Sequence, residues 1–262
     1  MPGQPTELRD GFALVPAPNH CLQDQFLKSC LSKWGMITSI KFACFSFVKP
    51  YHKLQGMEIL QDMFQSHAVQ YLLQPDNDSA AAGKKYTTSF EGANRISFKS
   101  VPATITNMSL FDRLMEHGIA RKDGMIIKCM EDYIDGFQVS DKLRDLLLNP
   151  ESSNVSIYSP VERAELLFCI FEHLCLGGAV NQFEDDIAAY LQASKLIYKD
   201  LVSVHKNSST SQVEVASAVY RVSDVPAGQL FPHKGRNNFC YVSVDTHKRQ
   251  CRLLYHAVQP FW

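Results

Sequence analysis

The sequence predicts an α+β fold in which central apolar helices pack on a mainly antiparallel C-terminal sheet. Two observations carry this prediction: a strongly apolar helical stretch over residues 159–175, and a change from helical to alternating hydrophobic spacing near residue 201. The 262 residues lie within the size range of one hydrophobic core, and 45% apolar with 20% charged residues is typical of globular proteins. We therefore expect one domain, residues 19–262, after a flexible segment, residues 1–18.

The N-terminal third predicts two helices and one strand. Residues 1–18 are rich in proline and polar residues, which favours a flexible lead-in. Residues 20–34 have one apolar face at helical spacing, and Gly35 is a natural helix stop. Residues 36–48 are rich in β-branched and aromatic residues and predict a strand. Residues 54–73 return to helical spacing and predict a second helix.

The middle of the chain alternates between loops and short elements. Residues 76–85 are small and polar and predict a surface loop, followed by a short hairpin of residues 86–90 and 95–98. Residues 109–117 predict a short helix capped by Ser109 and terminated by Gly118. Ile126 and Ile127 begin an apolar stretch whose type the pattern leaves open. Residues 140–148 predict another helix, ended by Asn149-Pro150.

Residues 159–207 give the clearest local signals. Ser159-Pro160-Val161-Glu162 is a helix start with a capping box, and the helix to Cys175 is apolar on most sides, so it should be the buried central helix. Gly177-Gly178 ends it. A second helix is expected from Asn181, with Glu184, Asp185 and Asp186 in its first turn. Its predicted buried face is formed by Phe183, Ile187, Tyr190 and Leu191.

The C-terminal quarter predicts the sheet. Residues 201–206, 213–222, 239–244 and 251–258 alternate apolar and polar positions. Turn-forming residues separate the first pair, and residues 245–249 separate the last pair. Because such short turns join antiparallel neighbours, we expect an antiparallel sheet of at least four strands.

Composition and cysteine usage favour an intracellular protein. The eight cysteines form no CxxC pair, and several lie in apolar runs where a free thiol packs as a small hydrophobe. Residues 1–20 resemble no signal peptide, and no stretch has the apolar length of a membrane span. A net charge of −1 gives no reason to expect nucleic-acid or membrane partners.

The charge is nevertheless uneven along the chain. From Lys199 onward there are eight Lys and Arg residues against four Asp and Glu residues. This excess fits a solvated, mildly basic sheet surface, and it also fits a docking face for an acidic partner. Tyr190, Tyr198, Lys195 and Lys199 form a second possible protein-contact surface on the helix that precedes the sheet.

No motif for a phosphate loop, a dinucleotide site, a nucleophile elbow or a zinc protease occurs in the sequence. Gly177-Gly178 follows a helix C-terminus, whose partial negative charge disfavours phosphate, so a helix stop is the better interpretation. Glu184, Asp185 and Asp186 offer a possible acid/base or cation site, although solvated carboxylates explain them as well. We predict no catalytic, cofactor-binding or metal-binding residues.

The C-terminal histidines provide the alternative of a metal-dependent, oxygenase-like enzyme, and a Cys/His group on a helix is a separate possible metal site. Cys169 and His173 lie four residues apart on one helix, with Cys175 nearby, which is a spacing that can share a metal, but the apolar character of the helix favours buried cysteines and a packed or edge-exposed histidine. The C-terminal part supplies a second set with the donor types of an iron site, although Asp245 and His247 fall in a turn. That set comprises His205, His233, Cys240, Asp245, His247 and His256.

The run from Leu166 to Asn207 resembles the cilia- and flagella-associated protein 300 family, and the resemblance extends over roughly residues 20–258. Within the run it is carried by Leu167-Phe168-Cys169, His173 to Ala179, Gln182 to Asp185, Tyr190-Leu191, Lys195 to Val204 and Lys206-Asn207. Outside it the matching residues are Arg113-Leu114, Ile127-Lys128-Cys129, Val139-Ser140-Asp141 and Leu254-Tyr255-His256. The loop of residues 76–85 and both ends diverge.

The resemblance implies a factor for assembling the outer and inner dynein arms of motile cilia, acting in the cytoplasm and at the axoneme. Its implied partners are axonemal dynein subunits and cytoplasmic dynein-arm assembly factors. It implies no catalytic residues, so we expect a non-enzymatic adaptor without a cofactor. A structural axonemal component is a further alternative.

Overall fold

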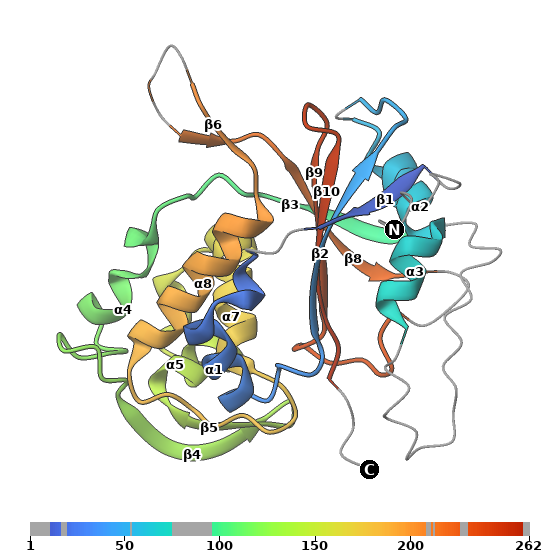
Figure 1. Cartoon of the computed structure of the whole chain (residues 1–262). Coiled ribbons are helices and arrows are strands. Elements are labelled where there is room, and N and C mark those ends of the chain that lie inside the picture. The colour runs from blue at the N-terminus through green and yellow to red at the C-terminus, as the bar shows by residue number, and fades with distance from the viewer. Residues whose placement is uncertain are drawn as a thin grey trace, which may run out of the picture.

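The computed structural model describes residues 11–16, 20–52, 54–74, 96–207, 211, 213–225 and 230–258. Its centre is an antiparallel six-stranded sheet of order β1-β2-β10-β9-β8-β3 (Figure 1). The strands are β1 (Phe12–Val15), β2 (Ile40–Phe47), β3 (Ser97–Val101), β8 (Ala218–Asp224), β9 (Phe239–Asp245) and β10 (Gln250–His256). The last strand in the sequence therefore lies at the middle of the sheet.

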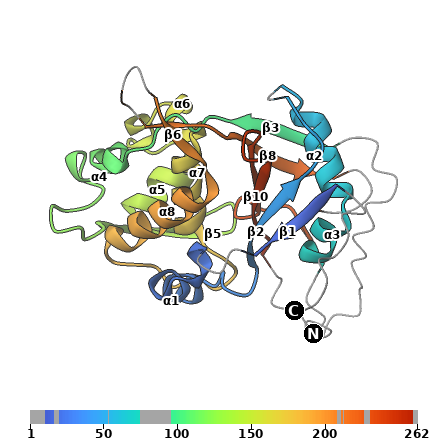
Figure 2. The same cartoon turned by 45° about the horizontal axis from the view of Figure 1, so that its top comes forward.

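Helices cover both faces of this sheet (Figures 1 and 2). One face carries α1 (Gln25–Lys33), α4 (Arg113–Glu116), α5 (Lys142–Leu148), α6 (Pro160–Ala164), α7 (Leu166–Leu176) and α8 (Ile187–Leu201). The other face carries α2 (Gly56–Gln65) and α3 (His67–Leu73). Short 3-10 helices lie at Cys21–Gln23, Met108–Phe111 and Val155–Ile157. Two hairpins stand outside the main sheet: β4 (Lys128–Ile134) with β5 (Phe137–Asp141), and β6 (Val204–Lys206) with β7 (Val213–Val215).

Two hydrophobic cores follow from this layering, one on each side of the sheet. Alternate side chains of β9 enter different cores: Phe239 and Tyr241 pack with the α7 side, while Cys240 and Val242 pack with the α2 side. Every residue of β9 is buried, as expected for a strand with both faces covered. Helix α7 lies at the centre of the larger core.

The predicted α+β class is confirmed, and so are several local predictions. The helix of residues 20–34 appears as a 3-10 turn and α1, and it ends before Gly35, whose φ of +66° suits glycine. The strand predicted at residues 36–48 is β2. The antiparallel hairpin predicted around residues 245–249 joins β9 to β10, with Gln250 opposite Asp245. Helices α7 and α8 pack side by side on one face of the sheet (Figure 2).

Several boundaries differ because capping residues divide the predicted helices. The helix predicted over residues 54–73 is split at Ser66, which is extended and caps α3. The helix predicted over residues 159–175 is split at Glu165. The helix predicted from Asn181 begins at Ile187, because the Asp186 carboxylate accepts a hydrogen bond from the Ala188 amide. Asn107 rather than Ser109 caps the turn that precedes α4.

The strand predictions need three corrections. The stretch left untyped after Ile126 is the β4–β5 hairpin, which also takes the first two residues of the helix predicted at 140–148. Residue 201 ends α8, so the strand predicted at 201–206 is only β6, and the strand predicted at 213–222 is divided into β7 and β8. Residues 12–15, expected to be flexible, form β1 because Phe12 packs against Phe47 and Tyr51. The loop predicted at 76–85 and the hairpin segment 86–90, with Arg95, lie outside the described residues.

The predicted capping box at the start of α6 is present. The Ser159 hydroxyl accepts a hydrogen bond from the Glu162 amide (3.3 Å), and the Glu162 carboxylate accepts one from the Ser159 amide (2.9 Å). We expect Ser159→Ala to lower the free energy of unfolding by about 1 kcal/mol, because one helix-start amide loses its partner. Urea denaturation would measure this loss, and Ser159→Asp should restore most of it. An unchanged midpoint for Ser159→Ala would contradict the prediction.

Candidate functional site

One hollow in the described part of the chain is a pocket of about 650 Å³. Its walls come from the β4–β5 hairpin, α5, the end of α7 with the connection to α8, the loop of residues 230–238 that precedes β9, and Val258 after β10. Its lining combines aromatic side chains with basic and amide side chains, and includes Phe137, Arg144, Asn181 and Lys234. We call this hollow the Arg144 pocket. Of its lining residues, only His233 belongs to a candidate site considered from the sequence.

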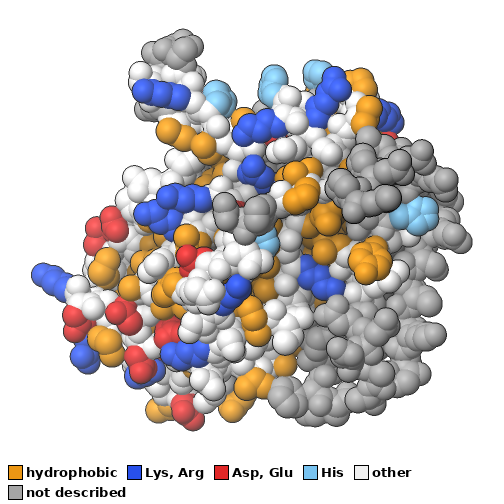
Figure 3. Space-filling model, in the orientation of Figure 1, with side chains coloured by type: hydrophobic (Ala, Val, Ile, Leu, Met, Phe, Trp, Pro, Cys, Tyr) orange, Lys and Arg blue, Asp and Glu red, His pale blue; other side chains and the backbone are white. Residues whose placement is uncertain are grey.

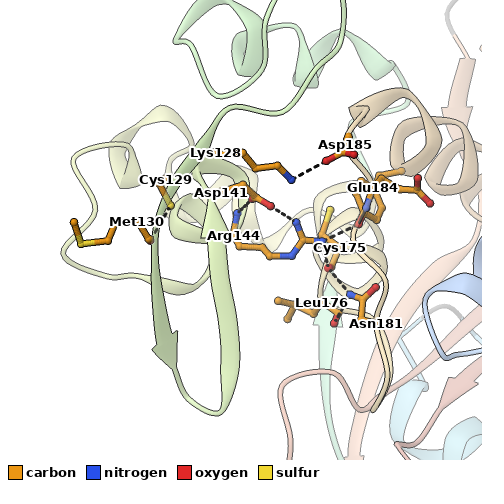
Figure 4. Close-up of polar contacts among 11 residues, drawn as sticks. Lys128, Cys129, Met130, Asp141, Arg144, Cys175, Leu176, Asn181, Glu184 and Asp185 are labelled. Carbon is orange, nitrogen blue, oxygen red and sulfur yellow. Dashed lines mark hydrogen bonds and ion pairs between the residues drawn. The ribbon is translucent and has the colours of Figure 1, made fainter.

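The floor of the pocket is the C-terminal end of α7, whose last carbonyls have no partners within the helix. Side chains supply those partners (Figure 4). The Cys175 carbonyl accepts hydrogen bonds from Arg144 Nη2 (3.2 Å) and Asn181 Nδ2 (3.1 Å), and the Leu176 carbonyl accepts one from Asn181 Nδ2 (2.9 Å). Asn237 Nδ2 donates to the Gly177 carbonyl (3.0 Å). The polar residues of the floor thus hold three segments of the chain together.

Arg144 is the centre of this network, and its side chain is only 1% exposed. Its Nη1 atom donates to the buried Asp141 carboxylate (2.5 Å), and its Nη2 atom donates to the Tyr190 hydroxyl (2.8 Å). The guanidinium carbon lies 3.4 Å from the centroid of the Phe183 ring. Its Nε atom is buried and has no hydrogen-bond partner. The sequence signal was an arginine within the leucine-rich stretch of α5, three residues after an aspartate.

The three acidic residues before α8 each have a structural partner. Glu184 accepts hydrogen bonds from Trp34 Nε1 (3.0 Å) and Lys33 Nζ (2.6 Å), which joins the α8 segment to α1. Asp185 pairs with Lys128 (2.7 Å), and this ion pair lowers the pKa of the Asp185 carboxyl. Asp186 is the cap of α8. The structure therefore places these carboxylates in three separate contacts rather than in one acid/base or cation site.

The second predicted contact surface is only partly present. Tyr190 is fully buried and stacks on Trp34, with ring centroids 4.8 Å apart, and Tyr198 is also buried. The prediction that these two tyrosines belong to a contact surface is therefore wrong, because both side chains face the core from α8. Lys195 and Lys199 are exposed on the opposite side of the same helix.

The histidine and cysteine residues proposed as metal ligands are dispersed. His173 stacks on Phe239 and hydrogen-bonds to the Tyr241 hydroxyl (3.0 Å), while His205 lies exposed on β6 beside Glu214. Within the described ranges, no three His, Cys, Asp or Glu side chains gather in a geometry that would hold a metal. All eight cysteines are free, and burial raises the pKa of the Cys175 thiol.

The remaining members of the C-terminal set also have other roles. Asp245 accepts hydrogen bonds from the His247 and Lys248 amides (both 3.0 Å), so it shapes the β9–β10 turn. His256 is fully buried in β10, and its Nδ1 atom lies 2.8 Å from the Asn237 carbonyl. His233 lies exposed at the Arg144 pocket, and Cys240 is buried in β9.

The buried His256 makes stability depend on pH. Burial lowers the pKa of His256 to about 4, while the unfolded chain has a value near 6.5. Because the unfolded state binds more protons between these values, stability is lost as the pH falls from 6.5 toward 4, by on the order of 3 kcal/mol. We expect His256→Phe to flatten this part of the profile in urea titrations. Parallel profiles for the two proteins would contradict the assignment.

Part of the basic C-terminal region lies at one end of the molecule, whereas Lys234 and Arg236 lie at the Arg144 pocket. Figure 3 shows Lys, Arg and His side chains gathered along the top of the view, where Figure 1 places the β6–β7 hairpin and the β9–β10 turn. Lys248 is 55% exposed there, and His205 is 54% exposed. Acidic side chains gather instead on the helical side.

No helix within the described residues combines the length and the apolar character that crossing a bilayer requires.

Comparisons with known proteins give a consistent result. The model of the family described as cilia- and flagella-associated protein 300 matches residues 11–256. Cilia- and flagella-associated protein 300 of Chlamydomonas reinhardtii is 40% identical over 258 residues, covering 96% of this chain and 99% of the relative. The Paramecium tetraurelia protein of the same name is 29% identical, covering 96% and 95%. No solved structure matches. The resemblance predicted from the sequence is confirmed: the chain belongs to the cilia- and flagella-associated protein 300 family.

Proposed function

We propose that this protein is a non-enzymatic adaptor that assembles the outer and inner dynein arms of motile cilia. The observation that carries the proposal is the family match, which spans nearly the whole chain and includes a relative covered over 99% of its length. The family's name associates it with cilia and flagella, and dynein-arm assembly is the specific role that we propose within that setting. The protein would act in the cytoplasm and reach the axoneme with its cargo.

The arrangement of polar groups supports a binding role over a catalytic one. The charged side chains that could take part in catalysis are engaged in structural contacts: Glu184 with Trp34, Asp185 with Lys128, and Arg144 with Asp141. Burial lowers the pKa of His173 well below its ordinary value, which holds it neutral in the core. Two surface regions remain available to binding partners: the basic end of the sheet and the Arg144 pocket.

The test is a tagged pull-down from the cytoplasm of cells that are building motile cilia, read by mass spectrometry. We expect axonemal dynein heavy or intermediate chains together with cytoplasmic assembly factors. Recovery of neither class would overturn the proposal. Detergent extraction supplies a second criterion, because an assembly factor should appear mainly in the soluble fraction. A protein retained with tubulin-bound axonemal components would instead be a structural part of the axoneme.

A further inference from the structure

The Arg144 pocket presents more hydrogen-bond donors than its own residues use. Arg144 lies at its floor with both terminal nitrogens engaged, but the Nε atom is buried without a partner. A buried N–H without an acceptor costs free energy, and the cost is recovered when an acceptor arrives. In Figure 4 the Arg144 side chain crosses from α5 to the end of α7, where it donates a hydrogen bond to the Cys175 carbonyl. The floor therefore favours a ligand that carries a hydrogen-bond acceptor.

The rim of the pocket adds positive charge. The loop of residues 230–238 brings His233, Lys234 and Arg236 to the opening. Lys234 is exposed and has no ion pair within the described part of the chain. Arg236 pairs with Glu172 behind the wall (2.8 Å) and more distantly with Asp135 (3.8 Å), the one carboxylate among the lining residues. An anionic group at the opening would meet an unpaired cation.

The walls of the pocket favour a ligand that has an apolar portion next to its charged group. Tyr133 and Phe137 of the hairpin, together with Phe183 over the guanidinium, provide aromatic surface. Aromatic walls accommodate an aliphatic stem or a neighbouring apolar side chain. A free inorganic anion would leave these walls without a contact. A Glu side chain within a peptide can contact the cationic opening with its carboxylate and the aromatic walls with its methylene groups and its neighbours.

We propose that the Arg144 pocket receives a Glu or Asp side chain from an acidic segment of a partner protein. The carboxylate accepts a hydrogen bond from Arg144 Nε and pairs with Lys234, and adjacent apolar atoms pack on Phe137 and Tyr133. The inference deepens the adaptor proposal and rests on it only for the ciliary origin of the segment. The chemistry of the pocket stands on the structure alone.

Binding of a defined probe to the full chain tests this inference. The probe is a short fluorescein-labelled peptide of Glu residues around one Phe, with a control peptide in which Gln replaces every Glu. We expect the Glu peptide to bind more tightly by about tenfold or more, with affinity falling as salt rises. In the protein labelled with 15N, the Arg144 Nε–H resonance should shift on addition of the Glu peptide only.

A matched pair of variants separates the pocket from general charge. Lys234→Glu should weaken binding of the Glu peptide by about tenfold, whereas Lys195→Glu, the same change on the exposed side of α8, should leave it unaltered. Equal binding of the two peptides, or equal losses in the two variants, would overturn the inference. Displacement of the peptide by equimolar inorganic phosphate would do so as well, because it would identify a small-anion site.

The two proposals fail in different ways. Peptide binding that depends on Lys234, with no dynein subunit in the pull-down, would retain the pocket and reject the assembly role. Dynein subunits recovered equally by the wild-type protein and by Lys234→Glu, with no peptide binding, would retain the assembly role and reject the pocket.

Discussion

Replacing Arg144 with methionine is expected to lower the free energy of unfolding by about 3–5 kcal/mol, because it leaves the Asp141 carboxylate buried without its cation. Asp141 has no exposed surface, and Arg144 Nη1 lies 2.5 Å from it. The same substitution removes a hydrogen bond from the Cys175 carbonyl and another from the Tyr190 hydroxyl. Urea denaturation followed by fluorescence would measure the loss.

Two controls make this expectation specific. Arg121→Met changes an exposed arginine on the same side of the molecule and should alter stability by less than about 0.5 kcal/mol. The double variant Asp141→Asn with Arg144→Met should be more stable than Arg144→Met alone, because asparagine leaves no buried charge and still caps α5. A double variant that is less stable than Arg144→Met would show that the ion pair is not the source of the effect.

Phe168→Ala is expected to cost about 3–5 kcal/mol, because it opens a cavity at the centre of the larger core. Phe168 is fully buried on α7, and its ring lies between Tyr158, at a centroid distance of 4.9 Å, and Phe111, at 6.4 Å. Phe171→Ala should cost a similar amount, since Phe171 is also fully buried and its ring centroid is 4.4 Å from that of Phe111.

Graded substitutions test the origin of this loss. Phe168→Leu should retain part of the packing and cost clearly less than Phe168→Ala, as measured by the midpoint of thermal unfolding. Val161, on the neighbouring α6, is 72% exposed, so Val161→Ala is the matched control and should change stability little. Equal melting of Phe168→Ala and the wild-type protein would mean that α7 is not the central core helix.

The sequence predicted those parts of the fold that depend on local patterns. The apolar stretch of α7 and the capping box at Ser159 are local signals, and each appears where it was expected. The β4–β5 hairpin was missed because its strands do not alternate cleanly. A bulge between Lys128 and Asp132 breaks the register and leaves Met130 90% exposed. In such a strand apolar and polar residues do not alternate regularly, so hydrophobic spacing does not predict it.

The Arg144 pocket could not be predicted because its walls meet only through tertiary contacts. In the sequence, Asn181 and Asn237 have no feature that distinguishes them from other loop residues. Both donate hydrogen bonds to carbonyls at the C-terminal end of α7, so their roles depend on where that helix ends. Glu184 was recognised as polar, but its bond to Trp34 spans 150 positions along the chain. Arg144 alone carried a local clue, since a buried arginine in a leucine-rich helix requires a partner.

The central position of β10 sets the order in which the molecule can be completed during synthesis. Strand β2 leaves the ribosome early, yet its neighbour in the sheet, with Gln250 opposite Ser46, is translated some two hundred positions later. Until then β2 and β9 present unpaired edges, which are the parts of a nascent chain most exposed to wrong pairing. A premature stop codon anywhere before residue 250 would remove the strand that joins the two halves of the sheet, so short C-terminal truncations should be as damaging as loss of the core.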